Sequence, residues 1–183
     1  MTRILPLLAL AAGLASGPAL AQEPAKPASP PPAAPQTYET AIKNNKGEEI
    51  GTASFRDGSN TLVARIAIKA GGLTPGWHGM HFHAVGDCSD TEKFANSKAH
   101  VNHDQSKHGL LNPDGPDEGD LPNIYAAADG SANAEVSSET PLTGEGGLKD
   151  ADGSALVFHA KEDDHTSQPI GGAGDRVACA VIK

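Results

Sequence analysis

The sequence has few aromatic residues and few basic ones. Only 4% of its 183 residues are aromatic, and 14 lysines and arginines stand against 23 aspartates and glutamates, for a formal net charge of −9. Binding to nucleic acid needs positive charge for the phosphates and aromatic rings for unpaired bases. We therefore expect no nucleic-acid partner.

No segment sustains the 3.6-residue apolar period of an amphipathic helix. The sequence instead contains 21 glycines and 14 prolines, and turn signals such as Asp57-Gly58 and Asp129-Gly130 separate its short apolar runs. Eight of these runs suit β-strands: 38–43, 50–56, 61–69, 77–84, 124–128, 132–138, 155–160 and 176–182. This pattern predicts an all-β, antiparallel sandwich or barrel.

A long apolar run is also missing at the N-terminus. The apolar stretch 4–14 follows Arg3, is interrupted by Pro6 and Gly13, and is too short to span a membrane. It is followed by the small-x-small site Ala19-Leu20-Ala21, which is typical of a secretory signal peptide. We expect residues 1–21 to be this signal, cleaved after Ala21, with no stable membrane insertion; the alternative is an uncleaved anchor.

Residues 22–36 are almost wholly proline, alanine and small polar residues. Such a segment buries too little apolar surface to offset its ordering entropy, so we expect a disordered, extended tether. The folded domain is then 37–183, in which two long segments, 85–123 and 161–175, resist strand assignment. Loops of this length inside a compact domain are usually functional and need something to hold them.

The two cysteines offer one such link. Cys88 lies in the first long segment and Cys179 in the last predicted strand. In an exported protein an isolated pair usually bonds, so we expect a disulfide between them; two free buried thiols are the alternative.

Histidines offer a second link. His81 and His83 are two apart in a predicted strand and therefore face the same way, whereas His78 faces the opposite way. Two converging imidazoles make half of a copper or zinc site. Further candidates are His159 in the apolar strand 155–160, and a group in the first long segment: His100, His103, His108, Asp114, Asp117 and Asp120. The alternative is a histidine-bearing strand without metal.

These residues resemble the copper,zinc superoxide dismutases, particularly the exported bacterial branch. The likeness covers 37–183, and its markers are His78-Gly79-x-His81-x-His83, His100 and His108, Gly119-Asp120-Leu121-Pro122-Asn123, Val157-Phe158-His159, Asp163-Asp164, and the run from Gly171 to Cys179. The resemblance implies an eight-stranded Greek-key β-barrel, periplasmic localisation, copper and zinc as cofactors, and superoxide as substrate. Exported relatives include monomers and dimers, so a homodimer is compatible with it.

The resemblance also implies roles for single residues. His100 would bridge both metals, Asp163 would link His81 to His108, and Arg176 would guide the anion beside copper. His78 would be structural, and the Cys88–Cys179 disulfide would tie the loop near Arg176. The implied copper ligands are His81, His83, His100 and His159, and the implied zinc ligands are His100, His108 and Asp120.

Three positions depart from the family pattern. Asp117 stands where the third zinc histidine is usual, His103 where a proline is usual, and Ala180 where a glycine is usual. Zinc binds carboxylate oxygen at about 2.0–2.2 Å, nearly as close as imidazole nitrogen, so we expect Asp117 to complete the zinc set. The alternative is a solvated Asp117 and a weakened zinc site, with His103 a surface residue.

The function expected on these grounds is conversion of superoxide to dioxygen and hydrogen peroxide by copper redox cycling, which would protect the cell envelope. A non-catalytic copper-binding or copper-buffering protein on the same fold is the alternative. A purely structural β-barrel module would not require five histidines at these spacings.

Overall fold

The computed structural model describes residues 37–183, and the predicted signal peptide and tether lie outside the described residues. Within this part the chain forms nine β-strands and one 3-10 turn. In order they are β1 (Thr37–Asn44), β2 (Glu49–Asp57), β3 (Leu62–Ile68), β4 (Gly76–His78), β5 (Met80–His83), η1 (Ala95–Ser97), β6 (Ile124–Ala126), β7 (Ala132–Ser138), β8 (Ser154–His159) and β9 (Arg176–Ile182). No helix among the described residues is long and apolar enough to cross a membrane.

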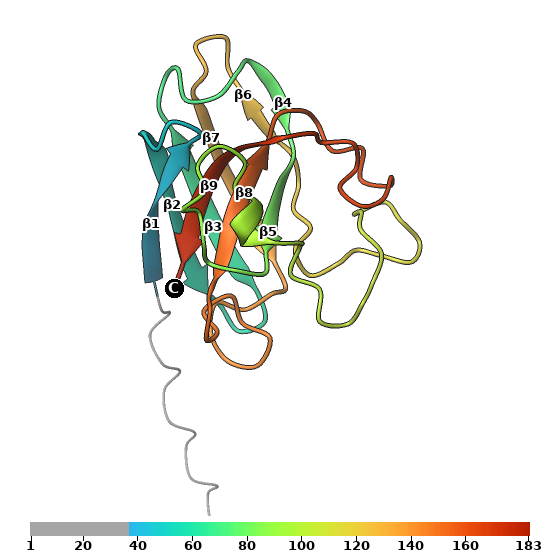
Figure 1. Cartoon of the computed structure of the whole chain (residues 1–183). Helices are drawn as coiled ribbons and strands as arrows, with labels where there is room; N and C mark the ends of the chain where they lie inside the picture. The colour runs from blue at the N-terminus through green and yellow to red at the C-terminus, as the bar shows by residue number, and fades with distance from the viewer. Residues whose placement is uncertain (1–36) are drawn as a thin grey trace, which may run out of the picture. The chain divides into compact units, whose positions relative to one another are not determined.

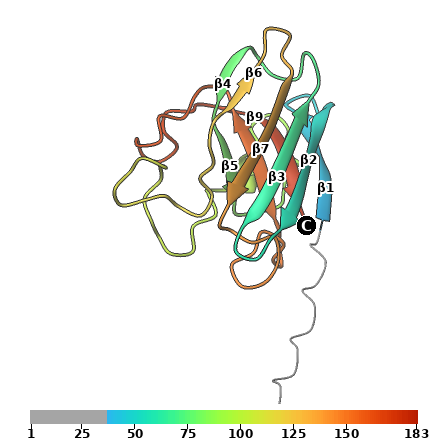
Figure 2. The same ribbon diagram turned by 180° about the vertical axis from the view of Figure 1, so that it is seen from behind.

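The strands form a curled antiparallel sheet (Figures 1 and 2). Seven strands follow the order β5-β8-β9-β1-β2-β3-β7, and β4 pairs separately with β6. Strand β1 lies between β2 and β9, and β3 pairs with β7, although β4, β5 and β6 come between them in the sequence. Such long connections between neighbouring strands are typical of a Greek key. The predicted antiparallel, all-β fold is confirmed.

One predicted strand is divided in two. The sequence predicts a single strand over 77–84, but the structure breaks it at Gly79 into β4, which pairs with β6, and β5, which pairs with β8. At the break the Gly79 N–H donates to the carbonyl of Lys161, and its carbonyl accepts from the His159 N–H. A Cβ here would lie 2.9 Å from that of Ala173, so the close approach of the 160–175 loop requires glycine.

Strand β5 is buried on both faces, which positions the histidines. Met80 and Phe82 belong to the main core, where large side chains such as Phe55 and Phe158 are wholly buried. His81 and His83 stand opposite Val157 and Ala155 of β8, so they share the other face of the sheet. Val157 and Ala155 belong to a small second cluster with Phe94, Cys179 and Cys88, contributed partly by the loop after β5.

The loops after β5 and after β8 lie side by side at one side of the sheet (Figures 1 and 2). The predicted disulfide is confirmed, since Cys88 in the first loop bonds to Cys179 in β9 with a Cα–Cα distance of 6.0 Å. A third long connection, 139–153 between β7 and β8, was not predicted as one. Its ends are ordered by backbone bonds such as that from the Leu148 N–H to the Pro141 carbonyl.

Candidate metal centre

Four predicted ligand histidines meet between β5, β8 and the first long loop. His81 and His83 come from β5, and His159 ends β8. An isolated β-bridge between His83 and His100 brings His100 of the loop alongside them. Ring centroids of His81 lie 4.2 Å from His100 and 4.8 Å from His159, and those of His83 and His100 lie 5.1 Å apart. All four side chains are buried.

Hydrogen bonds on one ring nitrogen orient three of these imidazoles. His81 Nε2 lies 2.7 Å from Asp163 Oδ2, His83 Nδ1 lies 2.7 Å from the Lys98 carbonyl oxygen, and His159 Nδ1 lies 2.9 Å from that of Gly174. Because these partners are acceptors, each bonded nitrogen carries the proton and the other keeps a lone pair. The nitrogens without a hydrogen-bond partner are His81 Nδ1, His83 Nε2, His100 Nε2 and His159 Nε2.

Burial favours the neutral form of His81, His83 and His159. Desolvation lowers the pKa of His81, lowers that of His83 well below its usual value, and lowers that of His159 to about 3. Ligand nitrogens of His81, His83 and His159 lie within 4.8 Å of one another, and those of His81, His100 and His108 do likewise. Neutral, oriented imidazoles with buried lone pairs are a donor set that fits copper.

A second group of ligand atoms shares His100. Atoms of His100, His108, Asp117 and Asp120 also lie within 4.8 Å of one another. His100 Nδ1 lies 2.9 Å from Asp117 Oδ2 and 3.7 Å from Asp120 Oδ1. Two imidazoles and two carboxylates, all buried, are a donor set that fits tetrahedral zinc.

The contact between His108 and Asp120 fits a group that holds a cation. His108 Nδ1 and Asp120 Oδ1 lie 2.5 Å apart, yet neither atom has the geometry of a hydrogen bond. Two ligand atoms directed at a common ion have this relation. Burial lowers the pKa of His108, but Asp120 and Asp163 outweigh it and raise that pKa to about 10, which marks an excess of negative charge.

Asp163 connects the two groups. Its Oδ2 accepts from His81 Nε2 at 2.7 Å, and its Oδ1 lies 3.2 Å from His108 Nε2. Burial would raise the pKa of Asp163, but the hydrogen bonds from His108 and His81 hold it well below its usual range. A Cβ on Gly171, where φ is +58°, would lie 1.6 Å from Asp163 Oδ1, so this position requires glycine.

Several supporting groups were missed by the sequence reasoning. Asn123 donates to the Asp163 carbonyl at 2.8 Å and accepts from the Asp163 N–H at 2.9 Å. It is the last residue of the 119–123 motif that carries the family resemblance, but its contact with Asp163 was not predicted. The His165 N–H donates to Asp163 Oδ1 at 2.7 Å. His83 and His159 are oriented by the backbone carbonyls of Lys98 and Gly174. The side chains at these two positions do not indicate this role, so the sequence could not predict it.

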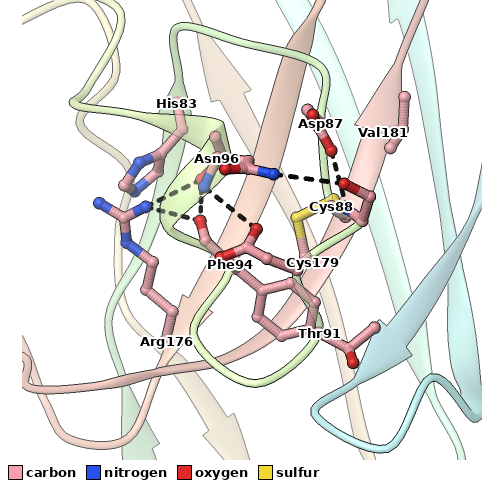
Figure 3. Close-up of a disulfide and its surroundings, with 12 residues drawn as sticks. His83, Asp87, Cys88, Thr91, Phe94, Asn96, Arg176, Cys179 and Val181 are labelled. Carbon is pink, nitrogen blue, oxygen red and sulfur yellow. Dashed lines mark hydrogen bonds between the residues drawn. A yellow bond between two sulfur atoms is a disulfide. The ribbon is translucent and has the colours of Figure 1, made fainter.

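Arg176 fastens the first long loop beside His83 (Figure 3). Its Nη1 donates to the Phe94 carbonyl at 2.7 Å and to Ser97 Oγ at 3.0 Å, and its Nη2 donates to the Lys98 carbonyl at 2.7 Å. The Lys98 oxygen therefore accepts from both Arg176 and His83. Cys88 of the same loop lies nearby, bonded to Cys179 of β9 (Figure 3).

Three predicted residues lie apart from the two ligand groups. His78 is buried, with its ring nitrogens 2.7 Å from the carbonyl oxygens of His159 and Thr74, which joins β4 to the end of β8. His103 is exposed, with Nδ1 2.8 Å from Glu118 Oε2. Ala180 is buried in the main core.

Comparison with known proteins decides the family. The sequence profile described as copper/zinc superoxide dismutase matches residues 49–182. The chain belongs to the copper/zinc superoxide dismutase family. A relative named superoxide dismutase [Cu-Zn] from Caulobacter vibrioides is 51% identical over 78% of this chain and 83% of the relative, and one from Aquifex aeolicus is 38% identical over 78% and 85%.

Solved structures agree on the fold of this family. A SOD-like protein from Bacillus subtilis has a TM-score of 0.75 at 28% identity, covering 82% of this chain and 100% of that one. A Cu/Zn superoxide dismutase from Brucella abortus has a TM-score of 0.63 at 26% identity, covering 81% and 100%. The predicted family, its oxidoreductase function on superoxide, and the copper and zinc cofactors are confirmed at the level of the family.

Proposed function

We propose that this chain is a periplasmic superoxide dismutase with a copper site of His81, His83, His100 and His159. The zinc site is assigned to His100, His108, Asp117 and Asp120, so that His100 would contribute to both sites. The observation that carries this proposal is the set of four buried imidazole nitrogens, one from each copper residue, that lack a hydrogen-bond partner. Unpaired buried polar atoms are costly, and a metal ligand role accounts for all four together.

Copper supplies the one-electron chemistry by which superoxide is oxidised to dioxygen and reduced to peroxide. The protein residues bind the anion and move protons. Arg176 uses three of its five N–H donors on the loop, which leaves two for an anion beside His83. His100 Nε2 can hold one proton and pass it to the reduced product, while Asp163 keeps His81 in its bonded tautomer.

Asp117 takes the place of a histidine in this assignment. Its Oδ1 accepts from the Gly119 N–H at 3.0 Å, which leaves Oδ2 facing His100 Nδ1 at 2.9 Å. The Asp117 N–H in turn donates to Asp120 Oδ2 at 2.9 Å, which fixes the Asp120 carboxylate to the backbone of Asp117. A second carboxylate makes the ligand set doubly negative, which a divalent ion neutralises.

Export is the third part of the proposal. The disulfide fits a protein that matures in an oxidising compartment. We assign residues 1–21 to a cleaved signal, 22–36 to a tether and 37–183 to the catalytic domain. Protein purified from the periplasm should begin at Gln22 by N-terminal sequencing, and a cytoplasmic protein that keeps Met1 would reject the export. A homodimer stays a prediction that sedimentation analysis would test.

The experiment combines metal analysis with a superoxide dismutation assay. The wild type should contain copper and zinc and be active, and His159→Ala should lose most copper and nearly all activity because one of four nitrogens is removed. His103→Ala is the matched control, since this histidine lies outside both ligand groups. Stoichiometric copper with full activity in His159→Ala would reject the site. Copper without activity in the wild type would favour the copper-buffering alternative.

A further inference from the structure

A large acidic cavity adjoins the proposed zinc ligands. It has a volume of about 810 Å³ and is bounded by the loop after β5, the start of β3 and the segment after β7. Six carboxylates line it: Asp104, Asp117, Glu118, Asp120, Glu139 and Glu145. Among the described residues that line it there is no lysine or arginine.

The carboxylates divide into an exposed set and a buried set. Asp104, Glu139 and Glu145 are exposed, Glu118 is half-buried, and Asp117 and Asp120 are 5% and 7% exposed. Thr140 fixes the backbone between them by donating from its Oγ1 to the Glu118 carbonyl at 2.6 Å. The cavity therefore leads from solvent-facing acidic side chains to two of the proposed zinc ligands.

A second observation points to a cation rather than to a solvated acidic surface. Asp120 lines the cavity, its side chain is 1% exposed, and its Oδ1 lies 2.5 Å from His108 Nδ1 without the geometry of a hydrogen bond. A buried carboxylate oxygen without a donor is costly unless a cation approaches it. Another cavity, of about 150 Å³ near His100, is lined by a single carboxylate, Asp150.

We propose that this cavity is the entry route by which Zn²⁺ reaches the site of Asp117, Asp120, His100 and His108. The exposed carboxylates raise the local concentration of divalent cations, and the ion then passes to the buried pair. A concave surface of one charge sign can raise the association rate of an oppositely charged ligand by about 10- to 1,000-fold at low salt. The inference rests on the proposed zinc site and adds a separate, kinetic role for residues that do not bind the metal in its final position.

The test measures Zn²⁺ uptake by the metal-stripped mature chain, with its disulfide intact, by stopped flow against a zinc-indicator dye. Glu139→Gln/Glu145→Gln removes two exposed carboxylates of the cavity, and neither belongs to the ligand groups. Glu39→Gln/Glu92→Gln is the matched control, because it removes the same charge from exposed positions that do not line the cavity.

We expect the cavity variant to take up zinc about three- to tenfold more slowly than the wild type at low ionic strength. The control should stay close to the wild type. The difference should vanish near ~0.5 M salt, where the screening length falls below about 5 Å. The zinc content at equilibrium should be the same in all three proteins.

Equal slowing in both variants would overturn the route, because net charge alone would then explain the rates. Wild-type rates in the cavity variant, together with full zinc content, would reject the route but leave the zinc site standing. A wild type that takes up no zinc at equilibrium would reject the zinc site and the route with it.

Discussion

Asp163 connects both proposed metal sites through one side chain. It accepts from a nitrogen of His81 on one oxygen and from a nitrogen of His108 on the other. Neither imidazole could keep its present tautomer if this acceptor became a donor. Asp163 lies outside the two proposed ligand sets and is nevertheless expected to affect metal binding.

Replacing Asp163 by asparagine tests this connection. The amide has one acceptor oxygen and one donor nitrogen, so only one of the two histidines can keep its bond. We expect the affinity for the metal whose histidine loses its bond, copper for His81 or zinc for His108, to fall by about 10- to 100-fold, measured by competition with chelators. Glu162→Gln is the control, since this neighbour is exposed. Unchanged affinity for both metals would show that Asp163 does not orient them.

Asp117 allows a prediction that separates the two metals. Asp117→Ala should lose zinc and keep copper, because the four copper histidines remain, and Asp117→His should keep zinc. Metal contents after dialysis against a weak chelator measure both effects, and Asp114→Ala is the control because this nearby carboxylate lies outside the ligand groups. Equal zinc retention in Asp117→Ala and the wild type would exclude Asp117 as a ligand.

The loop after β5 is the element that carries His100, His108 and both zinc carboxylates. Two connections attach its first part to β9: the disulfide of Cys88 with Cys179, and the three hydrogen bonds that Arg176 donates. The ligand-bearing part of the loop is attached separately to β5, by isolated bridges of His100 with His83 and of Asp120 with His81.

The disulfide should supply a large share of the stability. It closes a separation of 91 residues, and in the chain-entropy model this corresponds to about 4–5 kcal/mol. Cys88→Ser/Cys179→Ser should therefore lower the free energy of unfolding of the metal-free protein by about that amount in a urea titration. A reduced wild type should behave like the variant. A loss below about 1 kcal/mol would mean that other contacts hold the loop.

Arg176 should affect activity more than metal content. Arg176→Ala is expected to keep copper but to lose roughly tenfold or more in dismutation rate, because it removes the fixed positive charge beside His83. Its rate should also depend less on salt than that of the wild type. Arg65→Ala is the control, since this exposed arginine pairs with Glu135 on the opposite edge of the sheet. An unchanged rate and salt profile would assign Arg176 to loop attachment alone.

At the scale of the whole molecule, the buried histidines make the metal-free protein sensitive to pH in two directions. The pKa of His159 is lowered from 6.5 to about 3, so the unfolded chain binds more protons between these values and stability is lost as pH falls through this window. His81 and His83, whose pKa values are also lowered, act in the same direction. The pKa of His108 is raised to about 10, so stability is lost as pH rises from 6.5 to 10.

We therefore expect the metal-free protein to be most stable near pH 6.5. Urea midpoints measured from pH 4 to pH 10 should fall on both sides of this value. The alkaline loss should disappear in His108→Gln, because the residue no longer binds a proton, although the variant is less stable overall. A midpoint that rises steadily to pH 10 in the metal-free wild type would contradict the assigned charge state of His108.

The sequence by itself determined the fold class, the disulfide and the family. Strand alternation and turn residues are local properties, so most strand positions could be predicted from neighbouring residues. A lone cysteine pair leaves one possible intramolecular bond. The spacing of histidines and aspartates also named the residues that the structure brings together in two groups sharing His100.

Only the tertiary structure decided how those residues are held. The break at Gly79 depends on the approach of the 160–175 loop, which local sequence does not contain. The tautomers of His83 and His159 follow from the carbonyls of Lys98 and Gly174, backbone groups that every residue possesses. The acidic cavity joins residues from β7 and the loop after β5 that are distant in the chain, and it exists because the fold brings their charges to one surface.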